Sequence, residues 1–171
     1  MAPVVARGQV LSTGRSGRTV SPSDETAVDV VLRQFLGYRL KRAYNVIRAG
    51  LLVRLEPLGL RITTFSALAL IVDNAGIRQS ALAVALDIKR SNMVAIIDDL
   101  ESKELVVRRE SPSDRRAFAL YPTKSGRRLC RQALALTKEN EAHVTEQLSS
   151  GDLSKLLAAL ETIESCERKD Q

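Results

Sequence analysis

Apolar side chains recur every three or four residues over most of this chain, which is the spacing of α-helices that bury one face. Over residues 23–57 this spacing continues, and Asp24 and Glu25 suit a first helical turn because acidic groups favour its positive end. The pattern predicts one helix of roughly thirty residues. Such a long helix with two interior glycines, Gly37 and Gly50, needs a partner surface, and another subunit is the simplest candidate.

Three shorter helices are predicted after this one, over residues 63–74, 79–86 and 90–103. Residues 87–89 form a tight turn between the second and the third. The side chains expected to face inward are Phe65, Leu68, Ala69, Val72, Leu82, Leu86, Met93, Ile96, Ile97 and Leu100. A short helix, a turn and a second helix with a basic start are typical of a helix-turn-helix motif that reads duplex DNA.

Two β-strands are predicted next, because residues 105–110 and 117–121 alternate like the two strands of a ribbon. The charged residues 111–116 form the turn between them. A two-stranded ribbon is only marginally stable alone, so we expect it to lean on the helices beside it. Helix, turn, helix and ribbon together predict a winged helix-turn-helix domain.

Two further helices, over residues 123–147 and 153–163, complete the pattern after a break at residues 149–151. The predicted fold class is mainly α with a small β-hairpin wing (α+β). Residues 61–122 form the winged helix-turn-helix DNA-binding domain, and residues 24–60 and 123–168 form a helical dimerisation region. Residues 1–23, with three arginines and no acidic residue, are expected to form a flexible basic arm. The arm's arginines either extend into a minor groove or remain a solvated tail, and a transit peptide has a similar composition.

Charge separates the two ends of the chain, whose formal net charge is +6. Residues 78–128 hold 11 Lys and Arg against 7 Asp and Glu, a net of +4, whereas residues 139–171 hold 3 against 8, a net of −5. A polyanionic partner is therefore expected for the helix-turn-helix part and not for the C-terminal helices.

The exposed start of the third short helix carries Lys89, Arg90, Ser91 and Asn92, and Ala95 lies outward one turn later. These side chains supply donors for guanine and both a donor and an acceptor for adenine, while the helix dipole favours a nearby phosphate. Taken alone, the same residues equally fit a solvated surface. The wing that follows favours the DNA-binding interpretation.

At the wing, Arg115 and Arg116 are predicted to contact phosphate or to enter a minor groove. Asp114 is predicted to brace them, either by orienting Arg116 or by tying the tip to the preceding helix. A hairpin with ordinary surface charge is the alternative. The predicted DNA contacts are Arg78, Gln79, Ser80, Lys89, Arg90, Ser91, Asn92, Ala95, Arg115 and Arg116.

Nothing in the sequence points to an enzyme. The only histidine, His143, lies in an acidic helical stretch, and no nucleophile, phosphate-loop or paired-histidine motif is present. Cys130 and Cys166 lie far apart without metal-ligand spacing, so no metal and no cofactor are expected. No run of about 18 apolar residues exists to span a membrane, and residues 1–23 lack the apolar core of a secretory signal. We expect a cytoplasmic protein with no membrane partner.

With these residues in place, the chain resembles the MarR (multiple antibiotic resistance regulator) family of winged-helix transcription factors. The resemblance covers roughly residues 25–165 and rests on motifs in a fixed order: LEPLGL at residues 55–60, QSALAVAL at 79–86, DDLESKELVVR at 98–108, the wing signature Asp-x-Arg at 114–116 and Thr-x-x-Gly at 123–126. Three positions depart from the family pattern. Glu104 and Asp87 replace frequent glycines, and Lys89 stands where a Ser or Thr commonly caps the recognition helix. We expect Glu104 to make its helix end less sharp and Asp87 to adopt a left-handed conformation at some cost.

The resemblance implies an intertwined homodimer whose recognition helices lie about one helical turn apart, roughly 10 base pairs, on a palindromic operator. It also implies a repressor released by an effector, which in this family is a small aromatic or phenolic anion, in some members a coenzyme A thioester. The implied effector-binding residues are Phe35, Tyr38, Arg39, Arg42, Phe65 and Ser66. Each of these residues equally fits plain core or plain surface.

Two alternatives to an effector-gated repressor are a thiol-based redox sensor and a regulator that needs no ligand. In the family that this chain resembles, thiol sensors that respond to organic peroxides place the reactive cysteine near the start of the first helix. Here no cysteine lies between Met1 and Arg128, and Cys130 and Cys166 fall in the last two predicted helices. The sequence therefore favours the effector-gated repressor over the redox sensor.

Overall fold

The structure, a computed structural model, describes residues 28–111 and 114–166, and it describes side chains except for those of residues 111–117. The described chain forms two compact units, which divide after Lys41. The basic arm predicted for residues 1–23 lies outside the described residues. Helices dominate, with one small antiparallel sheet, which confirms the predicted fold class.

The first unit contains a short 3₁₀ helix, η1 (Leu32–Gln34), and the start of α2 (Leu36–Leu55). Phe35 separates them with an extended backbone, φ −95° and ψ 130°, so no helix continues through it. The single helix predicted over residues 23–57 is therefore wrong. A helical spacing of apolar residues is compatible with two helical segments and does not locate a break between them.

Polar contacts stabilise the break between η1 and α2. Arg33 Nε donates to one oxygen of the Asp29 carboxylate at 2.6 Å, and the Tyr38 hydroxyl donates to the other at 2.7 Å. Arg39 Nε donates to the Arg33 backbone carbonyl at 2.8 Å. Asp29 is only 8% exposed, so these partners compensate the removal of its charge from water.

In the second unit, α2 ends at Leu55 and η2 (Glu56–Leu58) leads to α3 (Ile62–Asp73). Gly59 follows η2 with φ 64°, a left-handed conformation that costs glycine little. The Leu60 N–H then donates to the Leu55 carbonyl at 3.3 Å, which closes the end of α2. This turn lies within the LEPLGL motif of residues 55–60.

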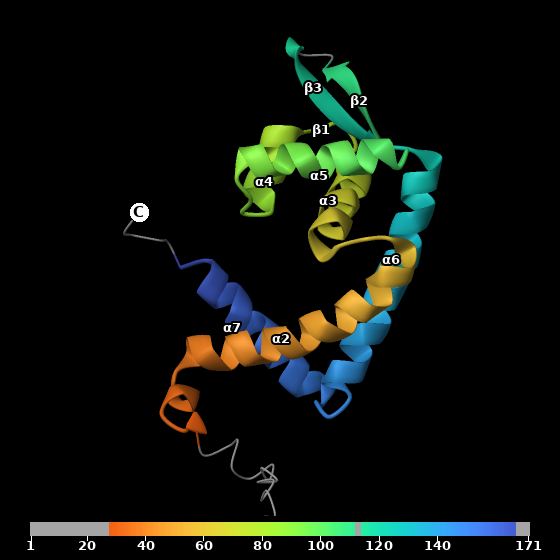
Figure 1. Cartoon of the computed structure of the whole chain (residues 1–171). Helices are drawn as coiled ribbons and strands as arrows, with labels where there is room; N and C mark the ends of the chain where they lie inside the picture. Colours follow the sequence, from red (N-terminus) through yellow and green to blue (C-terminus); the bar gives the residue numbers. More distant parts are fainter. Residues whose placement is uncertain (1–27, 112–113, 167–171) are drawn as a thin grey trace, which may run out of the picture. The chain divides into compact units, whose positions relative to one another are not determined.

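The helix-turn-helix motif consists of α4 (Gln79–Ala85) and α5 (Arg90–Ser102), which lie next to each other and close to α3 (Figure 1). The inner face of α5 carries Met93, Ile97 and Leu100, all fully buried. Both helices lie within one residue of their predicted bounds, because their apolar residues repeat clearly with the helical period.

The sheet has three strands, β1 (Ile77–Arg78), β2 (Val106–Ser111) and β3 (Asp114–Pro122), in the antiparallel order β1-β3-β2. The prediction of two strands missed β1, since a strand of two residues has no alternation to detect. The predicted turn over residues 111–116 was too long, because β3 begins at Asp114 and pairs it with Ser111. In Figure 1, β2 and β3 extend away from the helices as the wing.

The last two helices are α6 (Lys124–Thr145) and α7 (Ser150–Glu164). Side chains cap both of them, because the Thr123 hydroxyl accepts from the Gly126 N–H at 2.9 Å and the Ser149 hydroxyl accepts from the Asp152 N–H at 3.2 Å. The core of the second unit lies in the winged helix and the first turns of α6. Its fully buried large side chains are Leu55, Leu68, Ile71, Leu82, Met93, Val106, Ile97, Leu100, Leu120 and Cys130, with Asn140 as the polar exception.

Asn140 joins α6 to α2. It is 1% exposed, donates to the Ile47 carbonyl at 3.0 Å and accepts from Arg54 at 3.0 Å. Gly50 permits this contact, because a Cβ there would lie 2.2 Å from the Asn140 side-chain oxygen. Within the described ranges no single helix is long and apolar enough to cross a membrane; only a bent pair, α2 to η2 with α3, meets that length and composition together.

Candidate functional site

The first turns of α5 expose the side chains predicted to read DNA. Arg90, Ser91 and Asn92 are exposed, opposite the fully buried face of the helix. Lys89 is the N-cap residue and makes no side-chain capping hydrogen bond, as its replacement of a Ser or Thr predicts. The first-turn N–H groups therefore have no side-chain cap, and such a helix end favours an anion.

The other predicted contacts surround this helix start. Arg78 and Ser80 are exposed at the beginning of α4, and Gln79 is half-buried between them. Ala95 is exposed on α5. The structure brings these residues to the helix-turn-helix part of the second unit.

Asp87 ends α4 in a left-handed conformation, with φ 51°. The Asp87 N–H donates to Val84 at 3.1 Å and the Ile88 N–H donates to Ala83 at 2.9 Å. This pair of hydrogen bonds is the Schellman motif that usually employs glycine. The prediction that Asp87 adopts this conformation is confirmed.

Glu104 ends α5 in the same way, with φ 55°. The Glu104 N–H donates to Glu101 at 2.8 Å and the Leu105 N–H donates to Leu100 at 2.9 Å. The expectation of a less sharp helix end is therefore wrong. Leu100 and Leu105 are both buried, and this apolar contact accompanies the complete motif despite the missing glycine.

Arg108 ties the wing to the recognition helix. Its guanidinium donates to Asp98 at 2.7 Å and also to Glu101, and its backbone N–H donates to Glu101 at 3.0 Å. Two carboxylates thus compensate one arginine, which is only 26% exposed in its side chain. Arg108 therefore fixes the wing relative to α5, and its charge is compensated by Asp98 and Glu101.

The base of the wing is joined to the start of α6. The Thr123 N–H donates to the Leu105 carbonyl at 3.0 Å, while the Thr123 and Ser125 hydroxyls donate to the Glu104 carbonyl at 2.7 and 2.8 Å. A Cβ at Gly126 would lie 2.0 Å from the Leu105 carbonyl oxygen. This close approach gives the Thr-x-x-Gly motif a structural reason.

The outward face of the sheet contains an arginine that the sequence analysis missed. Ala119 on β3 pairs with Arg78 on one side and with Arg109 on the other. Residues directly opposite in a sheet share a face, so two exposed arginines flank one small side chain. The Arg109 guanidinium also lies over the Tyr121 ring, 5.2 Å from its centroid. The alternation of residues 105–110 could have identified Arg109 as outward-facing, but not Arg78 as its neighbour.

The wing-tip residues are described only in their backbone. Asp114, Arg115 and Arg116 form the start of β3 rather than the predicted turn. Their side chains lie outside the described part of the structure, so the phosphate or minor-groove contacts predicted for the arginines and the brace predicted for Asp114 stay predictions.

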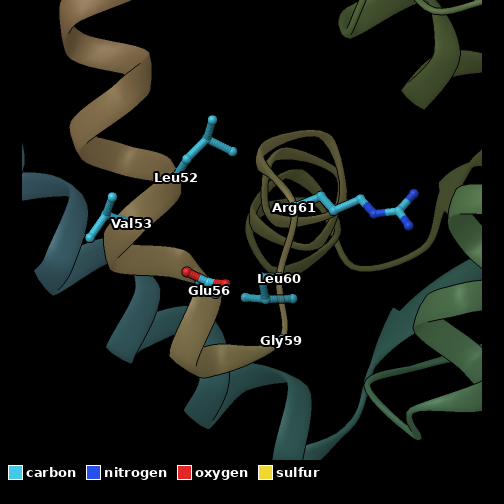
Figure 2. Close-up of a pocket in the computed structure, with 6 residues that line it drawn as sticks. All are labelled: Leu52, Val53, Glu56, Gly59, Leu60 and Arg61. Carbon is cyan, nitrogen blue, oxygen red and sulfur yellow. The ribbon is translucent and has the colours of Figure 1, made fainter.

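In the second unit, cavities occur beside the end of α2, between α2 and the start of α3, and between the start of α3 and α5. One of about 440 Å³ is lined by Leu52, Val53, Glu56, Gly59, Leu60 and Arg61. A second of about 280 Å³ is lined by Tyr44, Arg48, Leu52, Arg61, Ile62 and Thr63, and a third of about 160 Å³ by Arg61, Thr63, Thr64, Ala95, Ile96 and Asp99. Figure 2 shows Arg61 extending away from the α2 side chains Leu52, Val53 and Glu56.

The predicted effector-binding residues divide between the two units. In the first unit Phe35 is 60% exposed, while Tyr38 and Arg39 take part in the contacts around Asp29 and Arg33. In the second unit Arg42 is exposed.

Phe65 and Ser66 also belong to the second unit. Phe65 is a core residue with 7% exposure, and the Ser66 hydroxyl donates to the Ile62 carbonyl at 2.9 Å. These two side chains are therefore already engaged by the protein itself. The residues that line the cavities at the α2–α3 junction form a different set.

The cysteines differ in environment. Cys130 is buried, and burial, together with the nearby Asp73 carboxylate, raises the pKa of its thiol, although Arg131 opposes the shift. A raised pKa leaves less of the reactive thiolate. Cys166 is exposed and free. Among the described residues no group of three or more His, Cys, Asp or Glu side chains is placed to hold a metal ion.

Comparisons with known proteins indicate one family of regulators. The sequence profile of the MarR family matches residues 58–117. A relative from Thauera aromatica, described as a proposed transcriptional regulatory protein for the hcr operon, is 36% identical over 100 residues. That match covers 58% of this chain and 60% of the relative, so it spans less than two thirds of the relative's length.

Solved structures are similar over a longer stretch. The transcriptional repressor CouR bound to a 23-mer DNA duplex is 38% identical, with a TM-score of 0.74, over 80% of this chain and 96% of that chain. CouR from Rhodococcus jostii RHA1 bound to p-coumaroyl-CoA is 28% identical, with a TM-score of 0.73, over 81% and 98% of the two chains. The winged helix, the motif order and these similarities together show that this chain belongs to the MarR family and is a transcriptional regulator of that type.

Proposed function

We propose that this chain is a homodimeric repressor that binds a palindromic operator and is released by a small aromatic or phenolic anion or its coenzyme A thioester. The observation that carries the proposal is that one face of α5 packs against the core while its start is exposed. Its Met93, Ile97 and Leu100 face is fully buried, so Arg90 and Asn92 at its exposed start face solvent in a fixed orientation. A helix held in this way suits the major groove.

The proposed DNA contacts have distinct roles. Asn92 reads adenine, Lys89 and Arg90 bind guanine or phosphate, and the wing residues Arg115 and Arg116 bind phosphate or the minor groove. Asp114 braces the wing. The contacts between Arg108 and α5 support this assignment, because they keep the wing and the recognition helix in one fixed arrangement.

A dimer would cover two apolar surfaces. The first unit exposes Val28, Val31 and Phe35 to 87%, 67% and 60%, and α7 exposes Leu156, Leu157 and Ile163 to 44%, 57% and 43%. Clusters of large apolar side chains in water mark interaction surfaces. The family relationship favours a second copy of this chain as the partner.

The effector class is supported by the related CouR from Rhodococcus jostii RHA1, which is bound to p-coumaroyl-CoA. In thermodynamic terms, an effector must bind the DNA-incompetent conformation better than the DNA-competent one. Phe35, Tyr38, Arg39, Arg42, Phe65 and Ser66 stay predictions for its binding site. Phe65 contributes to the core whether or not it also touches a ligand.

The test is a selection of duplexes from a random-sequence pool by the purified full chain. We expect a palindromic consensus with half-sites centred roughly 10 base pairs apart. Asn92→Ala should then weaken binding to the selected duplex by about 1–3 kcal/mol and leave binding to random duplex unchanged. Fluorescence anisotropy titrations measure both quantities.

Arg116→Ala is the matched comparison, since a phosphate contact should weaken binding to selected and random duplexes alike. Recovery of no consensus would reject sequence-specific binding. An equal loss for Asn92→Ala on both duplexes would remove this residue from base reading.

A further inference from the structure

The recognition helix α5 exposes one large apolar side chain close to its start. Val94 is 44% exposed and lies between Asn92 and Ala95, which are also exposed. Every other large apolar residue of α5, a helix that the structure describes in full, is buried or half-buried. Single exposed valines are common on protein surfaces, so the significance of Val94 depends on its position and on the groups around it.

Val94 lies on the side of α5 that the wing contacts. It precedes Asp98 by four residues and Glu101 by seven, and side chains at these spacings lie on one side of a helix. Arg108 of β2 donates to both of these carboxylates. Asn92 lies on the opposite flank, because each residue advances about 100° around the helix axis. Val94 and Asn92 therefore face different sides of a groove that holds α5.

Small side chains occupy the strip between these two flanks. Ser91 and Ala95 are exposed there, opposite the buried Met93 and Ile97. Their size allows bases to approach the helix closely, so that the larger Val94 comes into contact with base edges at its own flank. Valine in a helix has one strongly preferred χ1 rotamer, so its two methyl groups hold a fixed position and lose little freedom on contact.

The major groove offers a valine only one apolar group. The base edges there present hydrogen-bond donors and acceptors, and thymine alone adds a methyl group, at C5. Valine neither donates nor accepts a hydrogen bond from its side chain, so it can distinguish bases only through this methyl group. Lys89, Arg90 and the first-turn N–H groups, which have no side-chain cap, favour phosphate at the same end of α5. These charges make DNA a better partner here than an apolar protein surface.

We propose that Val94 reads one thymine in each half-site of the operator by packing its methyl groups against the C5 methyl group. This inference rests on the sequence-specific DNA binding proposed above. It goes further by assigning a base to a residue that was not among the predicted contacts. Asn92 and Val94 read different bases, because they lie on opposite flanks of α5, and the losses caused by Asn92→Ala and Val94→Ala should therefore add.

The test replaces thymine by deoxyuridine, which keeps the same base pairing and lacks only the C5 methyl group. Each symmetric pair of thymines in the selected palindrome is replaced in turn, and fluorescence anisotropy gives the dissociation constant of the full chain for each duplex. Replacement of one pair should weaken binding by about fourfold per half-site, the effect expected when one methyl group loses its buried contact.

Val94→Ala should weaken binding to the thymine duplex by about the same factor and should abolish the effect of deoxyuridine at that pair. A selection with this variant should recover a consensus without the preference for thymine there. The variant should fold, because Val94 is exposed and alanine has the higher helix propensity, and circular dichroism checks this. Val53→Ala removes the same two methyl groups from an exposed valine of α2 and is the matched control. It should keep both the affinity and the deoxyuridine effect.

The outcomes separate this inference from the proposed function. A deoxyuridine effect of unchanged size in Val94→Ala would assign the methyl contact to another side chain, such as Ala95, and overturn the inference. A selected palindrome in which no thymine responds to deoxyuridine would also overturn it. In both cases the consensus itself persists, and the proposed function stands. Failure to recover any consensus would reject the proposed function and this inference together.

Discussion

Two residues with side chains occupy backbone positions that favour glycine, Asp87 after α4 and Glu104 after α5. A left-handed conformation costs most residues roughly 1–2 kcal/mol, and Asp tolerates it better than Glu. Both helix ends nevertheless form complete Schellman hydrogen bonds. The surrounding packing, including the buried Leu105, therefore compensates a local penalty at both ends of the helix-turn-helix motif.

Replacing Glu104 by Gly should raise the free energy of unfolding by about 1 kcal/mol, since glycine removes the strain but has more conformational freedom in the unfolded chain. Asp87→Gly should give a smaller gain. Urea denaturation measures both. The control is Lys103→Gly, at a residue with φ −90°, which should lower stability. A Glu104→Gly protein no more stable than its parent would show that this position is not strained.

At the scale of elements, neighbouring arginines of β2 have opposite roles. Arg108 points toward α5 and is neutralised by Asp98 and Glu101, whereas Arg109 lies on the outward face over Tyr121. Alternation along a strand produces this division. The paired row of Arg78, Ala119 and Arg109 then concentrates positive charge on the outward face of the sheet.

We expect Arg109→Ala to weaken DNA binding for all sequences and to make its salt dependence shallower, by roughly 0.9 in the slope of log affinity against log salt for one lost phosphate contact. Anisotropy titrations at several salt concentrations provide the slope. Lys138→Ala, which removes an exposed positive charge from α6, should leave the slope unchanged. An unaltered slope for Arg109→Ala would restrict this arginine to packing against Tyr121.

At the scale of the whole molecule, the notable feature is that α7 exposes apolar side chains to solvent. Leu156, Leu157 and Ile163 remain 43–57% exposed although they repeat with a regular helical spacing. Such a stripe normally faces a core or a partner. The proposed dimer would bury this stripe. A palindromic operator follows from the twofold symmetry of such a dimer.

Leu157→Glu should shift the chain from dimer to monomer, because a charge in an apolar interface is costly. Sedimentation velocity measures the change, and binding to a palindrome should fall toward the affinity of one half-site. Ala158→Glu adds the same charge to the other side of α7 and should preserve the dimer. Circular dichroism distinguishes dissociation from unfolding. Dimers that persist in Leu157→Glu would place the interface elsewhere.

Local patterns by themselves determined the winged-helix fold and the family. Periods of 3.6 and two residues reveal the helices and the two longer strands, and motifs such as DDLESKELVVR have a direct structural counterpart in the contacts of Arg108 with Asp98 and Glu101. The exposed start of α5 was also predictable, since its buried face identifies the opposite one. The effector-binding residues were inferred from resemblance alone and stay predictions.

Only the tertiary structure decided the break at Phe35, the strand β1, the pairing of Arg78 with Arg109 across Ala119, and the position of Arg61 between three cavities. Each of these features depends on contacts that the periodicity of the sequence does not predict. The break depends on a buried carboxylate, and the pairing of the arginines depends on a strand too short to alternate. The position of Arg61 depends on the space that remains between packed helices. Periodicity shows which face of an element is buried. Packing determines which elements meet there and which side chain is left between them.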